Sequence, residues 1–81
     1  MPATVTNEQV EKVVYDALES FGAEPADIER DAEFKQLDVD SLDLAEMSQI
    51  VNEEFGVKLT SDDVREIRTV GDAIDLVVAR A

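Results

Sequence analysis

Apolar residues recur at steps of three and four over the first part of the chain, the spacing of one face of an α-helix. Thr6 precedes this stripe as a side-chain cap, and Gln9 is placed to reach back to it. Val5 stands where it can pack against Val10, and Gly22 can adopt the left-handed conformation that ends helices. The pattern predicts a first helix between Thr6 and Gly22, with a buried stripe of Val10, Val13, Val14, Ala17, Leu18 and Phe21.

The next segment, residues 23–39, loses this period and predicts a long connection with one helical turn over residues 25–28. Connections of this length are uncommon in compact domains unless side chains hold them in place. The apolar residues expected to anchor it across the helices are Ile28, Phe34, Leu37 and Val39.

A second helix is expected over residues 40–55, capped by Asp40 and followed by Gly56. Its core face carries Leu44, Met47, Val51 and Phe55, with Ser48 at the border. The opposite side carries Glu46, Gln49 and Glu53, with Leu42 and Ala45 beside them. Two apolar residues among acids, turned away from the core, indicate a contact surface.

Two further helices complete the pattern. A short one begins near Thr60 and buries Val64 and Ile67, and a last one follows Thr69 with a stripe of Val70, Ala73, Ile74, Val77 and Val78. Nothing indicates a strand. We therefore expect one all-α domain over residues 1–81, a small four-helix bundle of three longer helices and one short helix, with a long loop between the first and second helices.

Composition restricts the chemistry of this fold. The 81 residues include no Cys and no His, which excludes Ser-His-Asp and Cys-His nucleophiles and the usual zinc sites, so no metal is expected. A formal charge of −13 disfavours nucleic acid and anionic membranes and favours basic protein surfaces as partners. No stretch has the length of a membrane span, and no basic start precedes an apolar run, so a cytoplasmic protein is expected. We also expect it to be a monomer.

Ser41 is the candidate functional residue, in the first turn of the second helix. The simplest interpretation is that it helps to start the helix. Asp40, however, already fills the capping position, Ser41 is expected to face solvent, and the apolar Leu42 is expected to be exposed beside it. A phosphodiester on this hydroxyl would meet unpaired backbone amides and the positive end of the helix dipole.

Asp40-Ser41-Leu42 at the start of an acidic helix, in an acidic chain of this length, resembles the acyl carrier proteins. The resemblance extends over the whole chain, including Phe34, Leu37, Glu46, the residues 53–55 and the residues 69–73. It implies that Ser41, flanked by Asp40 and Leu42, carries a 4′-phosphopantetheine arm added by a separate phosphopantetheinyl transferase. Acyl groups are then bound to the thiol of the arm as thioesters, and the protein itself catalyses nothing.

The same resemblance implies two surfaces. Ketosynthase, acyltransferase and other synthase enzymes would bind through basic patches to Asp43, Glu46 and Glu53, with Leu42 and Ala45 at the apolar centre. The acyl chain would be sheltered by apolar residues that also pack the core, namely Leu44, Met47, Val51, Val64 and Ile67.

Different features of the sequence indicate two different biosynthetic pathways. Phe34 and Leu37 are one residue closer than in most fatty acid carriers, which is similar to polyketide and other specialised-metabolite carriers. Residues 37–42 and 69–73 instead resemble stand-alone fatty acid carriers. We expect a stand-alone carrier of a dissociated polyketide or specialised-metabolite synthase, with fatty acid synthesis as the alternative.

Other classes of function explain less of the sequence. A calcium loop counted from Asp38 has Asp43 where Gly is needed and Gln49 where Glu is needed. Acid–base chemistry by Asp62 and Asp63 would need a cleft that a chain of this size has little room to form. An acidic helical adaptor, which binds basic protein partners without a prosthetic group, remains as the alternative.

Overall fold

The computed structural model describes residues 5–81, so the first four residues of the expected domain lie outside the described residues. The elements in chain order are α1 (Asn7–Ser20), the 3₁₀ turns η1 (Pro25–Asp27) and η2 (Phe34–Leu37), α2 (Ser41–Phe55), α3 (Ser61–Glu66) and α4 (Val70–Arg80). Over this range the chain forms no strand, only an isolated bridge between Glu33 and Thr69. The all-helical class, the three longer helices and the short one are confirmed.

All four helices begin with a reciprocal capping box. The side chains of Thr6, Asp40, Thr60 and Thr69 each accept a hydrogen bond from the backbone N–H three residues on, and the side chain there accepts from the N–H of the cap. Two of the unpaired donors at each helix start are thereby satisfied. These local bonds explain why the first residue of each helix could be predicted from the sequence alone.

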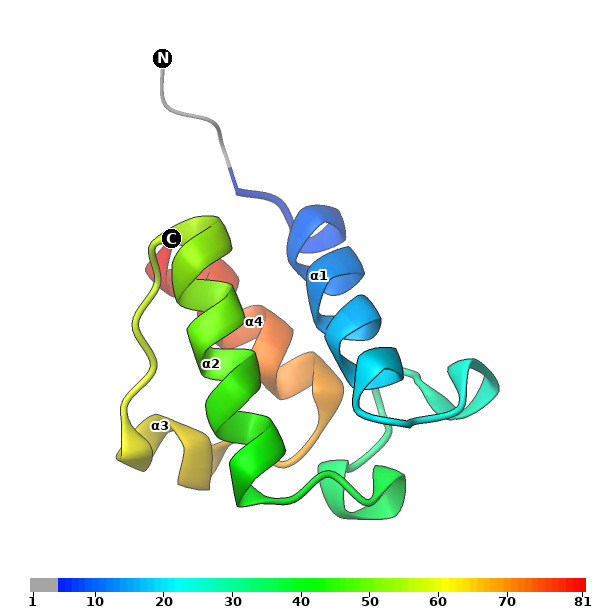
Figure 1. Ribbon diagram of the computed structural model, residues 1–81. Coiled ribbons are helices and arrows are strands. Elements are labelled where there is room, and N and C mark those ends of the chain that lie inside the picture. The colour runs from blue at the N-terminus through cyan, green and yellow to red at the C-terminus, as the bar shows by residue number, and fades with distance from the viewer. Residues whose placement is uncertain (1–4) are drawn as a thin grey trace.

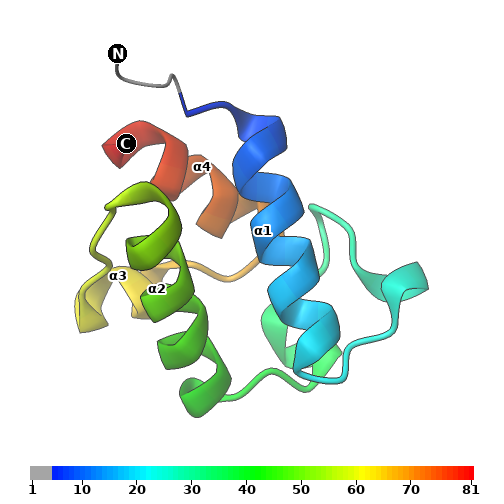
Figure 2. The same cartoon turned by 45° about the horizontal axis from the view of Figure 1, so that its top comes forward.

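The core lies between α1, α2 and α4, and α1 packs against both of the other two helices (Figures 1 and 2). Its largest fully buried side chains are Val10, Val14, Leu18, Met47, Val51, Val70, Ile74 and Val77. Leu44 and Phe55, expected on the core face of α2, are half-buried, and Ile50, which the pattern did not assign to the core, packs against it. The buried face of α2 is therefore broader than the predicted stripe.

The long loop is held to the first turn of α4 by backbone hydrogen bonds. The N–H of Gly71 donates to the carbonyl of Arg30 at 2.8 Å, and the N–H of Val70 donates to that of Ala32 at 3.0 Å. The Arg30 guanidinium also reaches Asp75 on α4 at 2.7 Å. The N–H groups in the first turn of a helix have no partners within the helix, and here two of them bind the loop. These bonds explain how so long a connection stays ordered.

The loop turns into α2 through η2 and a left-handed residue. The turn near Pro25 was predicted, but η2 was not, although its residues Phe34 and Leu37 were expected as anchors. Ile28, Phe34 and Val39 are buried and Leu37 is half-buried. Asp38 ends η2 with φ 58°, a conformation that Asp tolerates better than most residues. The chain then enters α2 at Asp40, which fixes where Ser41 lies.

Gly56 ends α2 in the left-handed conformation, with φ 69°. The following segment runs back along α2, so that α3 lies beside the first half of that helix (Figure 1). No helix within residues 5–81 combines the length and the apolar character needed to cross a membrane.

Candidate functional site

Ser41 is the first residue of α2, and its side chain is exposed. Asp40 performs the capping, since its Oδ1 accepts from the N–H of Asp43 at 3.0 Å. Within residues 5–81, the backbone N–H groups of Ser41 and Leu42 donate to no other protein atom. A free hydroxyl and two free amides therefore lie together at the positive end of a 15-residue helix.

Two open grooves meet at Ser41. The α2–α3 groove has a volume of about 440 Å³, and the loop groove, between η2, the start of α2 and the residues before α4, has about 410 Å³. Ser41 is the one residue that lines both of them. A group attached to its hydroxyl would therefore start on the ridge between the two grooves.

The α2–α3 groove is rich in hydroxyl groups. Four of its eight lining residues carry one, and the full lining is Ser41, Ala45, Ser48, Leu59, Thr60, Ser61, Val64 and Arg65. The Ser48 hydroxyl donates to the Leu44 carbonyl at 3.0 Å. The surface is thus partly apolar and partly able to accept or donate hydrogen bonds.

The loop groove has an apolar lining with a charged rim. Its apolar residues are Phe34, Val39, Leu44 and Ile67, and its charged residues are Glu33, Lys35, Asp40 and Arg68. Sequence reasoning did not single out Lys35 or Arg68, because 33 positions separate them along the chain and no local pattern links them.

The five residues expected to shelter an acyl chain do not line one common cavity. Leu44 and Ile67 line the loop groove, and Val64 lines the α2–α3 groove. Met47 and Val51 are 1% and 0% exposed and belong to the packed core. The structure therefore places three of the five beside Ser41, on two sides of it, and two in the interior.

The outer face of α2 is acidic with an apolar centre. Leu42 is 77% exposed, the most prominent exposed hydrophobic side chain of residues 5–81. Ala45, Glu46 and Glu53 are exposed along the same helix. Asp43 is half-buried, and its Oδ2 accepts from the N–H of Asp40 at 3.4 Å, so this carboxylate also serves the helix cap.

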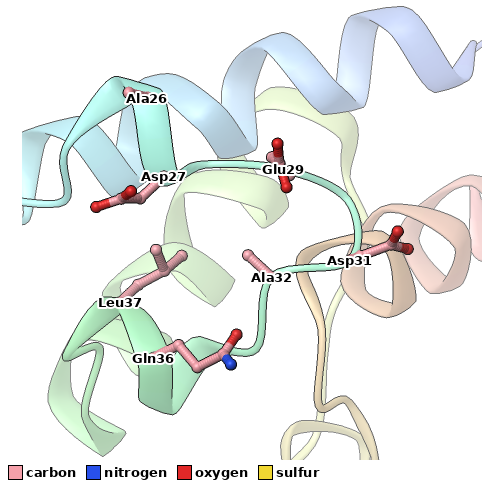
Figure 3. A pocket seen from close by; sticks show the side chains of 7 residues that line it. All are labelled: Ala26, Asp27, Glu29, Asp31, Ala32, Gln36 and Leu37. Carbon is pink, nitrogen blue, oxygen red and sulfur yellow. The ribbon is translucent and has the colours of Figure 1, made fainter.

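A third hollow lies within the long loop (Figure 3), and Ser41 is not among the residues that line it. Ala32 and Leu37 contribute apolar surface, whereas the carboxylates of Asp27 and Asp31 point in opposite directions in Figure 3. In the part of the chain that the structure describes, no group of three or more acidic side chains is arranged to hold a metal ion.

Comparison with known proteins defines the class of this site. Residues 12–77 match the family model described as "Phosphopantetheine attachment site". The match spans all four helices except the ends of α1 and α4, and it includes Ser41 and both grooves. The domain is thus one that carries phosphopantetheine.

Curated relatives narrow the class. An acyl carrier protein from Solidesulfovibrio magneticus is 38% identical over 86% of this chain and 87% of its own length. One from Nitratidesulfovibrio vulgaris is 41% identical over 86% and 90%, and one from Chlamydia trachomatis is 35% identical over 90% and 92%. The chain belongs to the acyl carrier protein family, and as such it is a carrier rather than an enzyme.

Proposed function

We propose that Ser41 is the residue to which the phosphopantetheine arm is attached. The observation that carries the proposal is the free Ser41 hydroxyl beside two unpaired amides at the positive end of α2. These groups suit a phosphodiester, because N–H donors and the helix dipole both stabilise a negative charge. Asp40 keeps this arrangement by capping the helix, which leaves the Ser41 oxygen free to be modified.

The attached arm supplies a thiol on which acyl groups are carried, which this chain cannot supply because it has no Cys. Its own residues present the hydroxyl, stabilise the charge of the linkage and bind the enzymes that use the cargo. The partners proposed are a phosphopantetheinyl transferase, and then ketosynthase, acyltransferase and other synthase enzymes.

The outer face of α2 is the proposed docking surface for these enzymes. Leu42 and Ala45 supply an apolar centre, and Glu46 and Glu53 supply charge that complements Arg and Lys on a partner. Asp43 lies on the same helix, where its carboxylate is shared between the helix cap and solvent. The face begins beside Ser41, so a bound enzyme would have the arm within its reach.

For the cargo, we propose contact with the residues beside Ser41 rather than with a preformed interior cavity. Leu44, Val64 and Ile67 are the apolar side chains available there. Met47 and Val51 can join them only if the core opens between the helices, because both are packed at 1% exposure or less.

We further propose that the carrier serves a dissociated synthase of polyketides or other specialised metabolites. The close spacing of Phe34 and Leu37 supports this, since it is similar to that of polyketide and other specialised-metabolite carriers. Depletion of the protein in its host should then remove a specialised product and leave membrane fatty acids unchanged. Growth arrest that added fatty acids relieve would assign it to fatty acid synthesis instead.

The proposed attachment residue is tested by two matched serine variants. Ser41 and Ser61 are both exposed first residues of a helix, each preceded by its cap. With coenzyme A and a broad-specificity transferase, Ser61→Ala should gain the mass of the arm and Ser41→Ala should not. If Ser41→Ala is loaded, or if it retains function in the host as an adaptor would, the proposal is wrong.

A further inference from the structure

The basic side chains of this acidic protein are distributed unevenly between paired and free positions. Three of the four arginines are bound to carboxylates: Arg30 to Asp75, Arg65 to Asp62 and Arg80 to Asp63. Within residues 5–81, the guanidinium of Arg68 has no carboxylate oxygen within 4.0 Å. Arg68 thus differs from the other three arginines in having no carboxylate oxygen this close, although its charge helps to lower the pKa of Asp72.

Arg68 and Lys35 line the loop groove, which Ser41 also lines. Lys35 likewise has no carboxylate oxygen within 4.0 Å in the described part of the chain, and both basic residues are exposed. Two cations with no carboxylate oxygen within 4.0 Å thus share one groove with the candidate attachment residue.

The position of this groove is fixed by backbone contacts on both sides. The N–H of Phe34 donates to the carbonyl of Arg68 at 3.0 Å, which joins η2 to the segment before α4. The N–H of Val39 donates to the carbonyl of Phe34 at 3.1 Å and closes the turn into α2. Lys35 comes directly after Phe34, and Arg68 supplies the carbonyl that Phe34 binds. The backbones of both basic residues are therefore held in place by this hydrogen bond.

The acidic residues of the groove are partly engaged elsewhere. Asp40 accepts a hydrogen bond from the N–H of Asp43 as the cap of α2. Glu33 is half-buried, and neither basic residue of the groove lies within 4.0 Å of its carboxylate. On the other side of Ser41, the α2–α3 groove contains one basic residue, Arg65, which is already paired with Asp62 at 3.7 Å.

We infer that Lys35 and Arg68 form a binding subsite for the phosphodiester of a group attached at Ser41. Guanidinium and ammonium groups bind phosphate oxygens through charge-assisted hydrogen bonds, and the linkage begins at an atom of a residue that lines their groove. They would draw the first part of the arm into the loop groove and away from the α2–α3 groove. The inference rests on the proposed function, because it needs the arm to be on Ser41.

The test compares the arm-free and loaded wild-type protein by ¹H–¹⁵N NMR, after intact mass has established complete loading. Amide shift changes outside the first turn of α2 should concentrate at Lys35, Val39, Ile67 and Arg68. The phosphorus resonance of the loaded protein should move when Lys35→Gln and Arg68→Gln are combined. A matched double variant, Lys58→Gln with Arg65→Gln, removes the same charge and should leave that resonance in place.

Shift changes concentrated at residues 59–65 of the wild-type protein would overturn the inference, as would a phosphorus resonance that both double variants move equally. If the variant that combines Lys35→Gln with Arg68→Gln is loaded incompletely, the two single variants are compared with the wild type in the same way. A wild-type protein that gains no mass overturns the proposed function itself, and the mass spectrum separates that result from failure of the subsite.

Discussion

Arg80, near the end of α4, donates two hydrogen bonds to the carboxylate of Asp63 in α3, with Nη2 to Oδ1 at 2.6 Å. The same carboxylate accepts from the N–H and the hydroxyl of Thr60, each at 2.9 Å. One side chain therefore holds both the start of α3 and its attachment to α4. Since α3 has only six residues, it depends on such contacts more than the longer helices do.

The Asp63 contacts make the stability of the protein dependent on pH. The Arg80 guanidinium, together with the Thr60 N–H, lowers the pKa of Asp63 from 3.8 to about 2. Because the folded-state pKa is the lower one, the ionised carboxylate stabilises the fold above about pH 4, and this contribution is lost as the pH falls towards 2. Asp63→Asn should therefore lower the Tm at pH 7, by a difference that shrinks between pH 4 and pH 2.

Asp62→Asn is the control for this comparison, since Asp62 is exposed and lies 3.7 Å from an equally exposed Arg65. Its Tm should stay close to that of the wild type across the range. Some acid sensitivity remains in Asp63→Asn, because the N–H groups of Arg68 and Thr69 also lower the pKa of Asp72. Parallel Tm curves for wild type and Asp63→Asn down to pH 2 would contradict the role of the ion pair.

Asp40 should matter for stability as well as for the site. Asp40→Ala removes the side chain that accepts from the N–H of Asp43 and should cost about 0.5–2 kcal/mol of unfolding free energy. Asp40→Asn keeps an oxygen acceptor and should cost much less. Urea denaturation measures both, and an Asp40→Ala variant as stable as Asp40→Asn would show that the cap contributes little.

Gly71 tests the attachment of the long loop to α4. An alanine usually stabilises a helix by about 1 kcal/mol relative to glycine, but a Cβ here would lie 3.0 Å from the carbonyl oxygen of Arg30. The Gly71 N–H binds that same oxygen at 2.8 Å, so the loop cannot move away without losing the bond. Gly71→Ala should therefore destabilise the protein by about 1–3 kcal/mol.

Asp75→Ala is the matched change for the loop, because it removes the exposed ion pair to Arg30 and leaves the backbone bonds in place. It should cost about 0–1 kcal/mol in urea denaturation. A Gly71→Ala variant more stable than the wild type would show that the loop tolerates displacement from α4.

The acidic face of α2 should control recognition by the transferase. Glu46→Lys combined with Glu53→Lys reverses the charge of the proposed docking surface and should lower the kcat/KM of loading by at least about tenfold through slower association. Asp16→Lys combined with Glu19→Lys makes the same change of charge at exposed positions of α1 and should change loading little. Equal effects of the two changes would indicate dependence on net charge alone.

Local interactions account for what could be predicted from the sequence. The caps Thr6, Asp40, Thr60 and Thr69 each bond within three residues, so their helices began where the pattern placed them. The exposure of Ser41 and Leu42 followed from helix periodicity and is likewise confirmed.

The features that could not be predicted from the sequence depend on interactions between distant parts of the chain. The loop is held through the backbone carbonyls of Arg30 and Ala32. Such backbone bonds cannot be predicted from the pattern of side chains. Asp63 and Arg80 are 17 positions apart, and no local pattern links them. The distribution of the expected cargo residues over two grooves and the core also depends on how α3 packs, which periodicity does not fix.

The central claim is tested most directly by locating the arm in the wild-type protein. After incubation with coenzyme A and a phosphopantetheinyl transferase, trypsin should release a peptide of residues 36–58, which contains Ser41 and Ser48 as its two serines. Fragmentation by mass spectrometry should place the added mass on Ser41. Added mass on Ser48, or no added mass with a transferase that loads another carrier in parallel, would contradict the account.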